Sequence, residues 1–487
     1  MNRIRQWAWI WLPLSFFVMC AGWALTSPPG SSPDDDFHLS SIWCAGGTRA
    51  GVCEQVPGHP DQRAVPAAVV NAAECFAFKP EVSAACVKDL PAGLVATDRV
   101  NVTANLYPGG YYRVMSILVG PDVERSVLVM RLANAGLAAL LLALLIRVVP
   151  VGISRAALLA VTITFVPLGL FLVASTNPSG WAVVGLTLYL AFAYALLVRT
   201  NWRSRRTWLI AGGVLVTGLM AVTSRLDAAV FVIIATVLAL VLAGVRHTRQ
   251  GWIAALLLFA ISVFGAYTYL GHGTPTFAGE GTGVGGAEPG VGLLLTNATY
   301  LPILFVQALG FGGLGWNDTV LPPLVGVVGV VAVGALAYAG LAVLTRRKAW
   351  AVVLAFAALI LVPLVVLQRD GLAVGEAVQP RYLLPLLAML VLVLCLGPSR
   401  AKPLELSGVP AIALAVALCL SAVLAYWANA HRYFGGSATG LFDFKLDPAW
   451  LSVTGVPLWL TTLITGAAGT VFVAGVLVTA RQSARRG

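Results

Sequence analysis

The fold is decided by residues 7–26, WAWIWLPLSFFVMCAGWALT. This stretch contains no charged side chain, and a helix needs about 20 apolar residues to cross a bilayer. A signal peptide is the competing interpretation, but its apolar core would be shorter and would end at a small-residue cleavage site. We therefore predict a first transmembrane helix within residues 1–26, with a cytoplasmic N-terminus that carries Arg3 and Arg5.

The composition of the whole chain is that of a polytopic membrane protein. Of its 487 residues, 59% are hydrophobic and only 10% are charged, whereas soluble domains carry about 25% charged residues. The net charge is +11, but the basic residues lie scattered between apolar runs. They form no binding stripe, so we expect no nucleic-acid partner. The excess of arginine over lysine, 26 to 5, is typical of a GC-rich bacterial genome and indicates a bacterial plasma membrane.

Eleven further apolar runs have about the length of a membrane span. They are residues 127–146, 156–174, 180–198, 208–223, 228–245, 252–270, 320–344, 349–367, 382–397, 409–428 and 456–479. Together with the first helix they predict an all-α polytopic membrane protein of about 12 transmembrane helices. Helices 2–7 fall in residues 126–270, and helices 8–12 fall in residues 320–487.

The loop charges predict the orientation. Eighteen of the 31 basic residues fall in short segments on one side, which is the positive-inside pattern and makes both termini cytoplasmic. They are Arg3, Arg5, Arg147, Arg155, Arg199, Arg203, Arg205, Arg206, Arg246, Arg249, Arg346, Arg347, Lys348, Arg400, Lys402, Arg481, Arg485 and Arg486. All carboxylates except Glu405 fall on the other side.

Two segments on the predicted outer face do not span in this topology. Residues 27–125 form a large extracytoplasmic loop, in which residues 106–119 are mildly amphipathic and suited to a membrane surface. Residues 271–319 begin with a glycine-rich stretch and continue into an apolar segment, 293–312. Because a span at 293–312 would reverse the charge pattern, we predict a re-entrant or surface-lying helix there.

Four cysteines in the large loop predict disulfides. Cys44, Cys53, Cys75 and Cys86 allow three pairings. We favour the short-range pairing, Cys44–Cys53 with Cys75–Cys86, which requires an oxidising compartment.

A cluster of acidic residues follows the first helix directly. Asp34, Asp35, Asp36 and His38 lie within residues 32–38. Closely packed carboxylates repel one another, which raises at least one pKa. This predicts a general base or a metal site. The alternative is a solvated acidic turn.

Two arginines are expected at helix ends on the same face. Arg225 stands two residues before Asp227, and a local ion pair is the simpler interpretation. Arg381 and Tyr382 follow Gln379 at the start of a hydrophobic helix. An arginine at that depth is usually paired or functional, although interfacial anchoring is the alternative. A guanidinium suits phosphate because its donors are paired.

Several motifs occur in an order that resembles a known family. They are Pro33-Asp34-Asp35 with His38, Tyr107-Pro108 with Tyr111 and Tyr112, Asn177-Pro178, Gly315-Trp316-Asn317-Asp318, and Gln379-Pro380-Arg381-Tyr382-Leu383-Leu384-Pro385. The chain resembles bacterial polytopic membrane proteins placed in the GT-C glycosyltransferase superfamily. Two of these motifs also have a simpler structural interpretation. Asn177-Pro178 is typical of a turn, and the segment from Trp316 to Thr319 could be a helix N-cap. Relatives usually have glycine where Pro380 stands, which alters the backbone beside Arg381.

The resemblance implies a GT-C-like fold and transfer of a sugar from a polyprenyl-phosphate-linked donor to an envelope glycan or protein on the outer face. It implies Asp34 or Asp35 as the base. Binding residues would be Asp36, His38, Tyr107, Tyr111, Tyr112, Arg225, Gln379, Arg381 and Tyr382. Some members need a divalent metal, but no spacing here requires one, and no cofactor is certain.

A transporter or flippase of lipid-linked glycans is the alternative function. A carrier places its binding groups near the midplane, often on broken helices within repeats. This chain shows few charges inside its apolar runs and no repeat, which favours the enzyme.

Overall fold

The computed structural model describes residues 7–90, 92–199, 201–244, 248–272, 288–400, 402–406, 408–442 and 456–481. Some predictions made from the sequence therefore lie outside the described residues. They are the basic residues Arg3, Arg5, Arg246, Arg485 and Arg486, and the glycine-rich loop where it covers residues 273–287.

Twelve segments of the described chain are long and apolar enough to cross a membrane. The predicted all-α polytopic fold is confirmed. The segments are α2 (Ala8–Leu25), α7 (Val123–Val148), α8 (Val151–Thr164) continued by the kinked η2 (Phe165–Gly169) and α9 (Leu170–Val173), α10 (Ser179–Val198), α11 (Arg205–Ser224), α12 (Leu226–Ala243), α13 (Arg249–Gly271), α14 (Val291–Tyr300) continued by α15 (Pro302–Val306) and η3 (Gln307–Phe311), α16 (Pro323–Leu341), α17 (Arg346–Arg369), α19 (Gly408–Gly435) and α20 (Leu458–Arg481).

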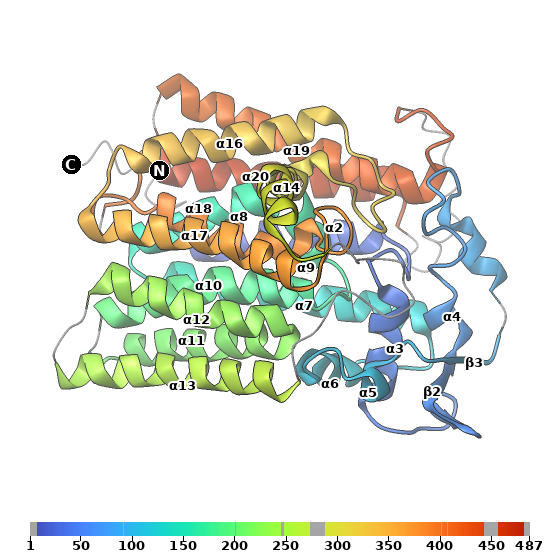
Figure 1. Cartoon of the computed structure of the whole chain (residues 1–487). Helices are drawn as coiled ribbons and strands as arrows, with labels where there is room; N and C mark the ends of the chain where they lie inside the picture. Colours follow the sequence, from blue (N-terminus) through green and yellow to red (C-terminus); the bar gives the residue numbers. More distant parts are fainter. Residues whose placement is uncertain are drawn as a thin grey trace.

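One member of this set differs from the set predicted from the sequence. The predicted span at 382–397 is α18 (Pro380–Leu394), which is shorter than the other spans, whereas Val291–Phe311 has the length and composition of a span. In Figure 1, α14 is seen nearly end-on, while neighbouring long helices lie across the page. The chain turns again at Gly310, which has φ +120°. The re-entrant or surface-lying position of this segment stays a prediction.

The centre of the bundle is formed by α8, α10 and α18, which pack on one another. Every residue of α8 after Val151 and every residue of α10 is buried. A helix that is apolar all round belongs in the interior. Close packing depends on small residues here, since a Cβ on Gly185 would lie 2.9 Å from the carbonyl oxygen of Thr217 on α11.

Residues 27–125 fold against one end of the bundle (Figure 1). They contain α3 (Asp35–Ala45), β1 (Glu54–Val56), β2 (His59–Pro66), α4 (Ala67–Val70), η1 (Ala84–Asp89), β3 (Leu94–Thr97), α5 (Asn101–Ala104) and α6 (Gly110–Ser116). The strands form an antiparallel sheet in the order β1-β2-β3. The sequence did not predict this sheet because its strands are short and carry no clear alternation.

The predicted disulfide pairing is confirmed. Cys44 bonds to Cys53 with a Cα–Cα distance of 5.2 Å, and Cys75 bonds to Cys86 with a Cα–Cα distance of 6.0 Å. The first bond joins the end of α3 to the start of β1. The second closes the turn between α4 and η1, so both bonds restrain the same folded segment.

The last turns of α19 bind this segment to the bundle. Arg432 forms a buried ion pair with Asp318 at 2.8 Å. Its guanidinium also donates to the carbonyl oxygens of Phe76, Lys79 and Val82. The interpretation of Asp318 as an N-cap is wrong, because the residue before α16 is Pro322.

Thiol labelling tests the disulfides. The free cysteines of the described chain are Cys20, Cys395 and Cys419. We expect maleimide to label these three thiols in denatured, unreduced protein and all seven cysteines after reduction. Cys44→Ser should add a label at Cys53 and nowhere else. A label at Cys75 in that variant would show that the pairs exchange.

Candidate functional site

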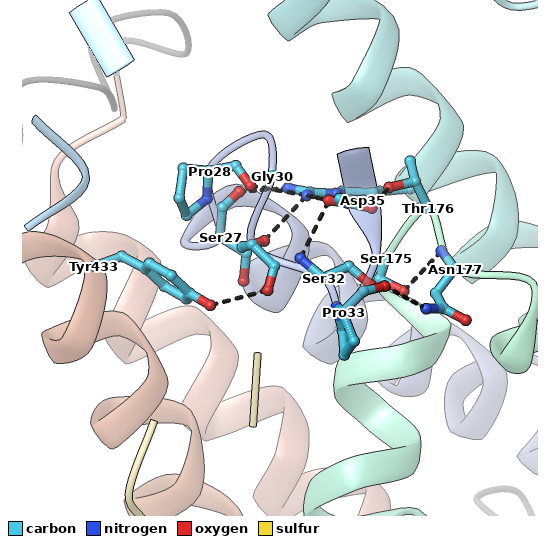
Figure 2. Close-up of polar contacts among 12 residues, drawn as sticks. Ser27, Pro28, Gly30, Ser32, Pro33, Asp35, Ser175, Thr176, Asn177 and Tyr433 are labelled. Atoms are coloured by element: carbon cyan, nitrogen blue, oxygen red, sulfur yellow. Dashed lines mark hydrogen bonds and ion pairs between the residues drawn. The ribbon is translucent and has the colours of Figure 1, made fainter. Parts of the chain in front are cut away.

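Figure 2 shows the turn between α2 and α3 with Ser27, Pro28 and Asp35. Arg131 of α7 holds this turn. Its guanidinium donates to the carbonyl oxygen of Ser27, to that of Pro28 at 2.9 Å and to the Ser31 hydroxyl at 3.2 Å. Its Nη2 also lies 3.7 Å from a carboxylate oxygen of Asp35. One buried cation therefore fixes the path of the turn.

Asp35 lies at the centre of this contact network and is 0% exposed. The Thr176 hydroxyl donates to one carboxylate oxygen at 2.7 Å, and the Ser32 backbone N–H donates to the other at 3.1 Å. Burial raises the pKa of Asp35 to about 6, although Arg131 and these two donors oppose the shift. Because its oxygens are engaged inside the protein, Asp35 is suited to holding the turn.

Three other distant segments also hold the turn. The Asn177 side chain donates to the Pro33 carbonyl oxygen at 2.9 Å. The Trp316 indole donates to the Gly30 carbonyl oxygen at 2.8 Å, and the Tyr433 hydroxyl donates to that of Ser31 at 3.1 Å. The Asn177 side-chain oxygen also accepts from the Ser179 backbone N–H. Asn177 therefore stabilises its own turn and contacts the acidic stretch at the same time.

Asp34 has different partners from Asp35. Its backbone is left-handed, with φ 56°, and its side chain is 34% exposed. One carboxylate oxygen lies 2.6 Å from Nη2 of Arg381 on α18, and the other lies 4.0 Å from Arg99. Burial favours the protonated acid, but Arg381 and the other nearby cations outweigh it and lower the pKa of Asp34. Asp34 is therefore an ionised carboxylate between two arginines.

Tyr382 connects Arg381 with Arg225. The Arg381 guanidinium donates to the Tyr382 hydroxyl at 3.2 Å, and the Arg225 guanidinium carbon lies 4.2 Å from the centre of the Tyr382 ring. Arg225 also binds both oxygens of Asp227, at 2.9 Å and 3.0 Å, as the simpler interpretation of that pair required. The cation–π contact is of the kind that stabilises stacked arginines.

His38 belongs to an aromatic cluster behind Asp34. Its Nδ1 lies 2.9 Å from the Tyr112 hydroxyl, and its ring packs edge-on against Tyr107 at 5.3 Å. Burial and the neighbouring arginines lower the pKa of His38 to about 3, against the pull of Asp34, so the ring is neutral. Its buried Nε2 has no hydrogen-bond partner within the described part of the chain.

The remaining predicted residues are distributed around this centre. Tyr111 accepts from the Asn134 side chain of α7 at 3.2 Å and packs against Trp181. Asp36 forms an ion pair with Arg99, which is half exposed. Gln379 lines a small hollow together with Arg381. In the residues that the structure describes, no three His, Cys, Asp or Glu side chains are grouped closely enough to hold a metal ion. We therefore assign no residue as a metal ligand.

A cavity of about 510 Å³ opens beside Arg225 and Tyr382. Its apolar wall comes from α12 and α17, and its polar end carries arginines and tyrosines. The apolar lining includes Val230, Phe231, Leu361, Val362, Val365 and Val366, and the polar lining includes Tyr107, Arg225, Asp227, Tyr269, Arg369 and Tyr382. An apolar wall and a polar end suit an amphiphilic lipid, and at that end Arg225 and Arg369 are each paired with an aspartate, Asp227 and Asp370.

Comparison with known protein families gives one match. The family described as "Predicted membrane protein (DUF2142)" matches residues 16–391. The chain belongs to this family. No curated protein and no solved structure matches the chain.

The DUF2142 match begins within α2 and ends within α18, and it includes Asp34, Arg225 and Arg381. The family description gives membrane location and no activity. The resemblance to GT-C glycosyltransferases therefore remains a prediction, as do the bacterial origin and the cytoplasmic termini.

Sequence reasoning missed Arg131, Arg99 and Thr176. Arg131 had a readable signal, because it stands five residues inside the apolar run that begins at 127, and an arginine within a span is usually paired. Arg99 and Thr176 have no such signal. Their contacts with Asp36 and Asp35 join residues 63 and 141 positions apart.

The structural role of Asp35 can be tested by substitution. Asp35→Asn leaves the Arg131 guanidinium buried without its counter-charge, so we expect a loss of roughly 3 kcal/mol in the free energy of unfolding. Asp36→Asn breaks only the pair with the half-exposed Arg99 and should cost less than about 1 kcal/mol. Equilibrium unfolding in detergent measures both. Equal effects of the two substitutions would contradict the role of Asp35.

Proposed function

We propose that this protein transfers a sugar from a polyprenyl-phosphate-linked donor to a cell-envelope acceptor. The observation that carries the proposal is the ion pair between Asp34 and Arg381, whose atoms lie 2.6 Å apart. The Asp34 side chain in this pair is 34% exposed. A carboxylate and a guanidinium at one point supply the base and the phosphate contact that this reaction needs.

The cavity beside Arg225 is the proposed donor site. The valine and leucine side chains of α12 and α17 would contact the polyprenyl chain, and Arg225 would face its phosphate. Tyr382 separates this arginine from Arg381. Neither Arg381 nor Asp34 lines the cavity, so a phosphate at its polar end would reach Arg381 only past the Tyr382 ring.

In the proposed reaction, the acceptor hydroxyl oxygen attacks the anomeric carbon of the donor sugar. The bond from that carbon to the phosphate oxygen breaks, and the lipid phosphate leaves with the electron pair. Asp34 takes the proton of the acceptor hydroxyl. Arg381 stabilises the charge that develops on the leaving phosphate.

Arg381 links donor binding to the base. Without donor, its guanidinium is paired with Asp34, which lowers the pKa of that carboxyl and weakens it as a base. A donor phosphate competes for the same guanidinium donors. When Arg381 turns toward the phosphate, Asp34 loses its strongest counter-charge, and its pKa rises toward the range useful for a base.

A lipid-glycan flippase would also need a cavity with an apolar wall. A carrier binds its substrate near the midplane and exposes it to each side in turn. Here Asp34, Arg99, Arg225 and Arg381 gather at the end of the bundle that carries residues 27–125. This placement supports transfer chemistry at one face over transport.

Replacing the base tests the enzyme directly. We expect Asp34→Asn to lower kcat for transfer from a polyprenyl-phosphate sugar by at least about 100-fold, because the amide cannot accept the proton. KM should change little. The control is Asp61→Asn, which removes an exposed carboxylate of the same segment. Full transfer by Asp34→Asn would remove the residue from the mechanism.

A matched pair of substitutions on α17 tests the donor cavity. Val365 lines the cavity, whereas Val353 is an exposed residue of the same helix outside it. Val365→Trp should fill part of the cavity and weaken binding of a polyprenyl phosphate by about tenfold or more. Val353→Trp should leave it unchanged. Equal affinities of the two variants in a binding titration would place the lipid elsewhere.

A further inference from the structure

A second cavity lies at the opposite end of the bundle from Asp34. The start of α10 contacts Arg225 through Ser179, at 3.2 Å. A helix of its 20 residues is about 30 Å long, so Arg199, which follows its last residue, lies at the other end. Here the end of α10 meets the starts of α11 and α13, and the cavity has a volume of about 790 Å³.

Three arginines line this cavity, and no carboxylate does so in the described part of the chain. The arginines are Arg199, Arg206 and Arg249. The other lining residues are Asn201, Ser204, Thr207, Ile210, Thr248 and Gln250. Three cations without a carboxylate in the same lining create a field that attracts an anion.

Two helix N-termini add to this field. Ser204 caps α11 and accepts from the Arg206 backbone N–H at 3.3 Å, and Thr248 caps α13 and accepts from the Gly251 backbone N–H at 3.1 Å. Both capping residues line the cavity. The first turn of a helix carries unpaired N–H groups and a partial positive charge, which suit a phosphate.

The rim of the cavity has the chemistry of a membrane interface. The rings of Trp202 and Trp208 pack at 5.1 Å, and the Trp202 indole donates to the backbone of the lining residue Gln250 at 3.1 Å. Tryptophan is enriched at the level of lipid head groups. The exposed apolar residues Leu209 and Ile253 follow on α11 and α13.

We propose that this cavity binds the phosphate head group of an anionic phospholipid. The acyl chains would lie along the exposed apolar faces of α11 and α13. Basic pockets between membrane helices are suited to such head groups. Free phosphate shares the charge, but it gains nothing from the apolar residues beside the rim. The site is separate from the proposed donor cavity and stands whether or not the protein transfers a sugar.

The test compares two variants with the same loss of charge. Arg199→Gln/Arg249→Gln removes two arginines of the cavity, both exposed, and keeps Arg206 with its bond to the Val148 carbonyl oxygen. Arg203→Gln/Arg205→Gln removes two exposed arginines next to the cavity but outside its lining, one before α11 and one at its first residue. Native mass spectrometry of the purified chain in detergent would count bound phosphatidylglycerol, with phosphatidylcholine of equal chain length as the neutral probe.

The expected result is retention of phosphatidylglycerol over phosphatidylcholine by the unaltered protein. The cavity variant should bind phosphatidylglycerol at least about tenfold more weakly, and the control variant should bind it as the unaltered protein does. An equal loss of phosphatidylglycerol affinity in both variants would mean that the lipid binds through general surface charge and would overturn the proposal. Displacement of the lipid by millimolar inorganic phosphate would also overturn it, since the site would then take the free anion.

Discussion

The buried ion pair between Asp35 and Arg131 is the interaction on which the arrangement of the site depends. Asp35 is the first residue of α3, and Asp34 precedes it with a left-handed backbone. Because Asp35 is drawn inward to Arg131 and Thr176, Asp34 is left to face Arg381. A buried charge is tolerated only when it is paired and hydrogen-bonded. The Asp35 carboxylate is paired and hydrogen-bonded, so it stays buried. Asp34 is thereby held where its side chain meets Arg381.

Three arginines and three aspartates balance one another on the outward side of the same turn. Arg99 and Arg381 flank the single carboxylate of Asp34, and Arg225 lies behind Tyr382. Asp36 and Asp227 each neutralise one of these arginines, which leaves Asp34 and Arg381 as the pair that a phosphate can separate. The tyrosine between the two guanidiniums keeps them close without direct contact and gives each a favourable ring surface.

Arginine has different roles at the two ends of the bundle. At the end with residues 27–125, Arg131 and Arg432 are buried and bind carbonyl oxygens and carboxylates, so they shape the protein itself. At the other end, Arg199 and Arg249 are exposed and line an open cavity. A cytoplasmic position of this end stays a prediction from the positive-inside pattern. The cavity and the two helix starts give those charges a place where a phosphate fits.

The sequence by itself determined the class of fold and the approximate positions of the spans, and it favoured the cysteine pairing that the structure shows. The spans depend on local hydrophobicity, and the short-range disulfides close short loops. Both can be recognised from neighbouring residues in the sequence. The sequence also singled out Asp34 and Arg381, although they stand 347 residues apart. Only the tertiary structure distinguished Asp34 from Asp35, because the distinction depends on Arg131 and Thr176 from other helices. It likewise decided that Tyr111 bonds to Asn134 of α7 and that α18 is a short buried helix, since packing partners and burial are properties of the assembled bundle.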